Sequence, residues 1–318
     1  MSALPASIAR RLSLPVIAAP MLRVSGPDLV VAACRAGVIG AFPTKNARTA
    51  EELDAWLTDI RTRLPQGAAP FCPNLIMRDA RLAEDLGVIA RHGAEIVITS
   101  VGSPAPAVGA LHDAGCLVLA DVATLRHAER AIEAGADGLI LLTAGAGGQT
   151  GWLNPFAFVR AVRAMFDGVV VLAGGVSDGV ALAAAEALGC DLAYMGTRFI
   201  ATAESLASDA YRAMLVDASM DDVLLTSSFT GLPANMLGPS IAAAGLDPAR
   251  LDESISEARA REQFGGGAAG PRRWADIWSA GHTVSGVSAV MGAAELVAQT
   301  VKEYRQAGGR FATSASRP

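Results

Sequence analysis

One unit recurs along the chain: a helical stretch, then a glycine, then a short run of apolar and β-branched residues. It appears in CRAGVIGAF (34–42), RHGAEIVITS (91–100), DAGCLVLADV (113–122), EAGADGLILLT (133–143) and ALGCDLAYMGT (187–197). The glycine suits the position just after a helix, where a left-handed backbone is needed. Helices that alternate with short apolar strands predict βαβ units and a parallel sheet that is buried on both faces.

Extended to the whole chain, the pattern predicts eight strands, each followed by a helix. The strands are expected at 16–21, 38–42, 70–76, 96–100, 117–122, 138–143, 169–175 and 192–199. Eight such units over about 200 residues favour an α/β fold of the (β/α)8 TIM-barrel type. An open, doubly wound sheet is the alternative, but it would need a G-x-G-x-x-G after the first strand, and this sequence has none there.

The regular repeat breaks after the eighth predicted strand. Residues 212–275 form too long a stretch for an ordinary loop. We expect them to form a small, mostly helical lid or substrate domain, inserted after strand 8 over the barrel mouth. Residues 1–211 and 276–318 would then make the barrel, with a last helix over about 285–307 that completes it.

Composition excludes several classes of function. Hydrophobic residues make up 52% of the 318 residues, yet no apolar run approaches the ~20 residues that span a bilayer. The N-terminus does not read as a secretory signal, so we expect a cytoplasmic protein that does not bind membranes. A net charge of −5 and 5% aromatic residues argue against a nucleic-acid partner. Four scattered cysteines, expected as buried free thiols, and four scattered histidines show no metal-ligand spacing, so no metal is expected.

Chemistry is expected where the strands end, because barrels of this type carry their active sites there. Polar or glycine-rich strand ends occur at Asn74, Ser100, Asp121, the loop AGAGGQTGW (144–152), Gly174–Gly175 and Gly196–Thr197. The last two follow strands 7 and 8, where backbone N–H groups and a hydroxyl can hold a phosphate. Tight turns without a ligand are the alternative.

A phosphate at this place could belong to a sugar-phosphate substrate or to a cofactor such as FMN. The chain has only two lysines, Lys45 and Lys302, and neither lies where a Schiff-base aldolase would need one. The expected lining is rich in backbone donors and poor in acid–base groups. A redox cofactor that brings its own chemistry therefore fits better.

Several segments together resemble the nitronate monooxygenase family, formerly called 2-nitropropane dioxygenases. They are IAAPM, PNL, AGAGGQTG, LAGGVSDG, LGCDLAYMGTRFIAT, TGLPANML and IWSAGH. Flavin-type enoyl-ACP reductases and certain NADH:quinone reductases are related to this family. The resemblance implies an FMN-dependent oxidoreductase with a TIM barrel and a small helical domain over the flavin, acting on a small molecule. The sequence leaves the oligomeric state open, with a homodimer as one option.

Within that resemblance two chemistries compete. One is the oxidation of nitronates by O2, and the other is NADH- or NADPH-driven reduction of a quinone or an enoyl thioester. A non-redox barrel, an isomerase or lyase acting on a phosphorylated metabolite, is an alternative of a different class.

The resemblance also implies positions for the cofactor. It places Ala19, Pro20 and Met21 along the isoalloxazine and brings Asn74 and Asp121 to the flavin. Without the resemblance, Asn74 would simply cap a turn, and Asp121 would be a strand-end carboxylate with its hydrogen bonds satisfied. The remaining expected cofactor contacts are glycines and one hydroxyl, namely Gly148, Gly174, Gly175, Gly196 and Thr197.

Gln149 stands where many relatives carry histidine within AGGHxG. Glutamine cannot take a proton at physiological pH, but it can donate and accept hydrogen bonds. This departure argues against proton abstraction and leaves hydride chemistry and oxyanion binding open.

Three other residues are candidates for the site. His282 is a candidate substitute base or else a capping histidine, and Trp152 either shields the flavin or packs at the rim. Asn235 is expected to face the substrate from the lid.

Overall fold

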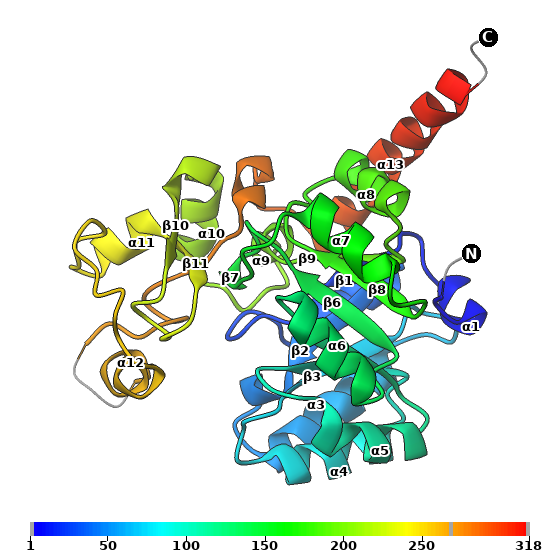
Figure 1. Cartoon of the computed structure of the whole chain (residues 1–318), viewed down its shortest axis with the longest axis horizontal. Helices are drawn as coiled ribbons and strands as arrows, with labels where there is room; N and C mark the ends of the chain where they lie inside the picture. Colours follow the sequence, from blue (N-terminus) through cyan, green and yellow to red (C-terminus); the bar gives the residue numbers. More distant parts are fainter. Residues whose placement is uncertain (1–2, 267–269, 316–318) are drawn as a thin grey trace.

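A ring of parallel strands surrounded by helices forms the larger part of the molecule (Figure 1). The computed structural model describes residues 3–266 and 270–315, with side chains as far as residue 308. Within these residues the strands close into a barrel in the order β1-β2-β3-β4-β5-β6-β8-β9, which confirms the predicted TIM barrel. Their bounds are β1 (Val16–Ala18), β2 (Ile39–Pro43), β3 (Phe71–Ile76), β4 (Ile96–Ser100), β5 (Leu117–Val122), β6 (Gly138–Leu142), β8 (Val169–Ala173) and β9 (Leu192–Met195).

Helices connect the strands and cover the outside of the barrel. They are α2 (Pro27–Ala36), α3 (Ala50–Arg63), α4 (Leu82–His92), α5 (Ala105–Asp113), α6 (Leu125–Glu133), α7 (Pro155–Arg163), α8 (Gly179–Leu188) and α13 (Ala293–Ala315). The glycine of each of the five recurring units has a positive φ, as the sequence predicts: Gly37, Gly93, Gly115, Gly135 and Gly189. All four cysteines are buried free thiols. Over the described part of the chain, no helix is long and apolar enough to cross a membrane.

The barrel interior is a packed core and not a channel. Ile17, Ile98, Leu119 and Val171 belong to one buried cluster that is formed by inward-pointing residues of the strands. Ile8 of the short helix α1 (Ala6–Ala9) joins the same cluster. The packed interior therefore leaves the carboxyl ends of the strands as the part of the barrel where a ligand is expected.

The segment 212–275, called the insertion here, lies as a smaller body beside the barrel, and helices α1 and α13 lie on the far side (Figure 1). It follows α9 (Thr197–Ile200) and begins within α10 (Asp209–Asp217). Its further elements are η2 (Met220–Asp222), β10 (Val223–Thr226), β11 (Ala234–Leu237), α11 (Gly238–Ala243) and α12 (Glu257–Phe264).

A small antiparallel sheet in the order β10-β11-β7 was not predicted from the sequence. Its third strand, β7 (Gly148–Gln149), comes from the loop AGAGGQTGW after β6, and it pairs Gln149 with Ala234 and Gly148 with Asn235. The prediction of a mostly helical insertion misses this sheet because its strands are short and one of them lies far away in the sequence. The insertion and the barrel thus share a sheet.

The last helix begins later than the sequence suggested. Residues 282–286 form a separate 3-10 turn, η3 (His282–Gly286), and α13 starts at Ala293. The Ala293 N–H donates to both oxygens of Glu204, at 3.1 and 3.0 Å, which fixes the start of the helix. A side-chain carboxylate at a helix N-terminus satisfies an amide that has no partner within the helix. Helix α13 packs against α8 and α2, as expected for the helix that completes the barrel.

Candidate functional site

A cavity of about 1320 Å³ opens at the carboxyl ends of the barrel strands, between the barrel and the insertion. Ligand pockets usually measure about 300–1,000 Å³, so this cavity has room for more than one small molecule. Most of the predicted site residues line it: Ala19, Pro20, Met21, Asn74, Asp121, Gly148, Gln149, Trp152, Gly174, Gly175, Gly196 and Thr197. Asn235 and His282 lie outside its lining.

The turn after β8 and the start of α9 form one side of the cavity. Gly174 and Gly175 have φ values of +112° and +79°. A Cβ added to Gly175 would meet no other atom within 4 Å, so this backbone borders open space. The Thr197 hydroxyl accepts a hydrogen bond from the Gly281 N–H at 2.9 Å, which leaves its proton free to donate. These groups suit the oxygens of a phosphate.

Asn74 and Ser100 form a buried polar pair on the cavity floor. The Asn74 amide donates to the Ser100 hydroxyl at 3.1 Å and lies near the Ile98 carbonyl at 3.4 Å. Asn74 is 5% exposed and points across to β4, so it does not cap a turn. Its carboxamide is held in place on the floor by this pair.

Asp121 is the acid–base group of the floor. Its Oδ1 atom is buried and has no hydrogen-bond partner among the described residues, so the alternative of a satisfied strand-end carboxylate is wrong. Burial raises the pKa of Asp121 from 3.8 to about 7. Tyr194 of β9 lies close by, since burial and then the Asp121 charge raise the pKa of its phenol well above the ordinary value.

The glycines of the loop AGAGGQTGW (144–152) are needed mainly for packing between backbones. A Cβ on Gly147 would come within 2.7 Å of the Gly281 nitrogen, and one on Gly281 within 2.7 Å of the Gly145 carbonyl oxygen. Gly145 and Gly147 therefore admit the segment around Gly281, and both also line the cavity. Gly148, with a φ of +68°, also lines the cavity, and it differs because a Cβ added there would meet no atom closer than 3.8 Å.

Gln149 follows on β7 and is half-buried against the cavity. Its carboxamide makes no hydrogen bond to any described residue, so it is available to a ligand. Its backbone, in contrast, is fixed by pairing with β11.

Asn235 and His282 hold this loop and do not face the cavity. The buried Asn235 amide donates to the Ala146 carbonyl at 2.7 Å, so the expected substrate-facing role is not what the structure shows. The His282 N–H donates to the Gly145 carbonyl at 2.9 Å, and its exposed side chain lies beside Gly145. His282 is therefore not placed to replace a base in the cavity.

Trp152 stands at the rim with 82% of its surface exposed, so it does not pack there.

Val101, directly after β4, was missed by the sequence interpretation. It lines the cavity with a φ of +54°, which is strained for a β-branched residue. The sequence around Val101 gives no indication of this strain. Tyr194 was missed as well, although its alternating position in a predicted barrel strand could have placed it inside.

Two segments that flank the insertion in sequence also line the cavity. Trp278 stacks on Tyr211 of α10, with ring centroids 4.9 Å apart and planes 13° apart, and the Tyr211 hydroxyl donates to the Ser279 carbonyl. All three residues line the cavity. Among the described residues, no cluster of side chains with metal-ligating chemistry is found.

Comparison with known proteins gives a consistent family. The sequence model described as nitronate monooxygenase matches residues 7–303. A nitronate monooxygenase of Paraburkholderia phytofirmans is 28% identical over 349 residues, covering 92% of each chain. A dehydrogenase of Mycobacterium tuberculosis, named for a hydroxy-methyl-oxo-octahydro-indene-carboxyl-CoA, is 29% identical over 229 residues. That match covers 70% of this chain and 62% of the length of the mycobacterial relative.

A solved structure agrees with the sequence relatives. The nitroalkane oxidase of Streptomyces ansochromogenes superposes with a TM-score of 0.77 at 26% identity, over 96% of this chain and all of the other.

Proposed function

The chain belongs to the nitronate monooxygenase family, and on this premise we propose that it is an FMN-dependent oxidoreductase that oxidises nitronates with O2. The observation that carries the proposal is the side of the cavity formed by Gly174, Gly175 and Thr197. There a left-handed glycine turn borders open space next to a hydroxyl with a free proton. This arrangement suits the phosphate of a flavin mononucleotide.

The remaining cavity residues fit the rest of the cofactor. Ala19, Pro20 and Met21 would lie along the ring, with Asn74 and Asp121 below it on the floor. Bound FMN would supply the electron transfer from the substrate to O2. The protein would supply binding, orientation and the exclusion of water.

Gln149 would orient the substrate. A nitronate is already an anion, so its oxidation does not require a base that removes a proton from carbon. The free carboxamide N–H groups of Gln149 can donate to the negatively charged nitro oxygens. The absence of histidine at this position therefore suits the anion better than the neutral nitroalkane.

A second candidate is hydride chemistry on a thioester, with NADH or NADPH as reductant in the reducing direction. Two observations favour it: the cavity, at about 1320 Å³, is larger than most ligand pockets, and Gln149 offers an oxyanion donor in place of a base. The mycobacterial relative is named as a dehydrogenase of a CoA ester.

One experiment separates these possibilities. The purified protein should be yellow and release FMN on denaturation, and a colourless protein without flavin would contradict the redox function. Under anaerobic conditions the protein is then mixed with NADH, with NADPH or with a nitronate. Bleaching by the nitronate alone supports the monooxygenase, whereas rapid bleaching by a nicotinamide nucleotide supports the reductase.

A further inference from the structure

Positive side chains gather at the cavity mouth, although the whole chain has a net charge of −5. Among the described residues, the carboxylates that line the mouth are Asp79 and Glu257, with Asp121 on the floor. The cationic residues that line the same opening are Lys45, Arg78, Arg130, Arg261 and Arg273. Such a concentration in an acidic protein attracts anions to the cavity.

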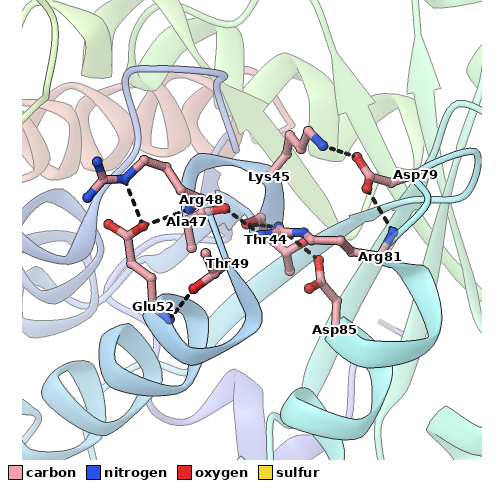
Figure 2. A network of polar contacts seen from close by, with 9 residues as sticks. All are labelled: Thr44, Lys45, Ala47, Arg48, Thr49, Glu52, Asp79, Arg81 and Asp85. Carbon is pink, nitrogen blue, oxygen red and sulfur yellow. Dashed lines mark hydrogen bonds and ion pairs between the residues drawn. The ribbon is translucent and has the colours of Figure 1, made fainter.

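Lys45 is already neutralised. Figure 2 shows it paired with Asp79, at 2.7 Å between Nζ and Oδ2. In the same network Arg81 donates to the Ala47 carbonyl at 3.0 Å and to the Thr44 carbonyl at 3.2 Å (Figure 2). These bonds join the loop after β2 to the loop after β3. The backbone next to Arg78 is therefore held firmly.

Of three further arginines that line the opening, one is paired with an acid. Arg78 reaches Glu257 of α12 only at 3.4 Å. Arg273 donates to the neutral Phe229 carbonyl at 3.0 Å, and burial together with the nearby Arg261 charge lowers its pKa. The Arg261 side chain makes no hydrogen bond or ion pair with any described residue. Arg78, Arg261 and Arg273, called the arginine cluster here, thus carry more positive charge than Glu257 can balance.

The arginine cluster lies away from the expected site of the cofactor phosphate. Arg78 follows β3, whereas Gly174 and Gly175 follow β8. In the ring order β1-β2-β3-β4-β5-β6-β8-β9, strands β3 and β8 stand opposite each other. An anion at the arginine cluster is consequently a second one, at the other side of the same large cavity.

We propose that the arginine cluster binds the phosphate groups of a substrate that carries its reactive acyl group on phosphopantetheine, as coenzyme A esters do. This inference rests on the second candidate function given above and assigns its substrate class. A ligand of this kind has an uncharged arm that spans the cavity and a polyanionic end for the arginines. Guanidinium groups bind phosphates through paired, charge-assisted hydrogen bonds.

The test measures the binding of coenzyme A by calorimetry, with pantetheine, which has the same arm without phosphates, as the comparison ligand. Arg261→Ala removes one cluster charge. Arg259→Ala is the matched control, because Arg259 lies two residues away on α12, is exposed and does not line the cavity. We expect Arg261→Ala and Arg78→Ala each to weaken coenzyme A binding about tenfold, the usual effect of losing one charged hydrogen bond. Arg259→Ala should leave the affinity unchanged.

Pantetheine should bind at least about tenfold more weakly than coenzyme A, and Arg261→Ala should not alter its binding. Arg261-dependent binding of a carrier protein that bears phosphopantetheine, with no binding of free coenzyme A, would assign the same chemistry to a protein-borne substrate. Equal affinity for coenzyme A and pantetheine, or equal effects of Arg261→Ala and Arg259→Ala, overturns the inference.

Failure of this inference is distinguishable from failure of the proposed function. If the protein is yellow and bleaches with substrate but does not bind coenzyme A, only the proposal for the arginine cluster is contradicted. If the protein is colourless but binds coenzyme A through Arg261, only the proposed redox function is contradicted.

Discussion

The Asn235 amide donates a 2.7 Å hydrogen bond to the carbonyl of Ala146, and this bond ties the insertion to the loop that carries Gln149. Both residues are buried, with Asn235 3% and Ala146 7% exposed. Removal of the amide leaves a buried carbonyl unpaired. The position of Gln149 thus depends on a residue that does not touch the cavity.

Asn235→Ala should lower stability by about 1–3 kcal/mol, the usual penalty for one unsatisfied buried group. It should also lower turnover, since the loop that carries Gln149 loses its side-chain bond to the insertion and keeps only the pairing with β11. A double-mutant cycle with Gln149→Ala checks the connection, because residues that act through one another give non-additive effects. Strictly additive effects on turnover would show that Asn235 serves stability alone.

Gln149→Ala should reduce turnover of a nitronate without creating activity on the neutral nitroalkane. Gln149→His should introduce a base and raise activity on the neutral form, with a pH dependence near the histidine pKa of about 6.5. Steady-state rates with both forms of one nitroalkane provide the measurement. Equal rates of the unaltered protein on both forms would refute the role given to Gln149.

Gly175→Val should abolish FMN binding while the barrel stays folded, because the new side chain enters the space expected for phosphate. Gly67→Val is a matched control. Gly67 has a φ of +81° against +79° at Gly175, a Cβ at either site meets nothing within 4 Å, and Gly67 does not line the cavity. Both variants therefore carry the same backbone strain, about 1–2 kcal/mol. FMN content after gel filtration should drop only for Gly175→Val, and equal flavin content in the two variants would remove the phosphate assignment.

Asp121 should make stability depend on pH. Burial raises the pKa of its carboxyl from 3.8 to about 7, with Tyr194 and Cys72 as its titratable neighbours inside the barrel. Between these two values the folded protein holds a proton that the unfolded chain has lost, so the free energy of unfolding falls as pH rises. Urea unfolding of the flavin-free protein at several pH values measures the slope, and Asp121→Asn should flatten it over this range. The same slope in both proteins would contradict a shifted pKa.

The sequence predicts the barrel well because each βα unit has a recognisable local pattern. A glycine such as Gly93 ends a helix, and a β-branched run such as IVITS follows at once. Because the carboxyl ends of all the strands meet on one face of the barrel, the predicted fold alone places Asp121 and Gly175 in one cavity. These parts depend on short-range patterns and on the closure of a ring.

Other parts depend on contacts between distant segments. Pairing of Gln149 with Ala234 involves a two-residue strand that has no pattern of its own. The arginine cluster joins Arg78 with residues almost two hundred positions later. For the same reason the close approach of Gly147 to Gly281 could not be predicted from the sequence.

The shared sheet has a consequence for how such proteins diversify. Strand β7 lies in the barrel's own loop but completes the sheet of the insertion, so the insertion is not an exchangeable module. A chimera that replaces only residues 212–275 with the equivalent segment of a relative would pair a foreign β11 with the native Gly148–Gln149. New substrate preferences built on this scaffold therefore require the loop and the insertion to be inherited, or engineered, as one unit.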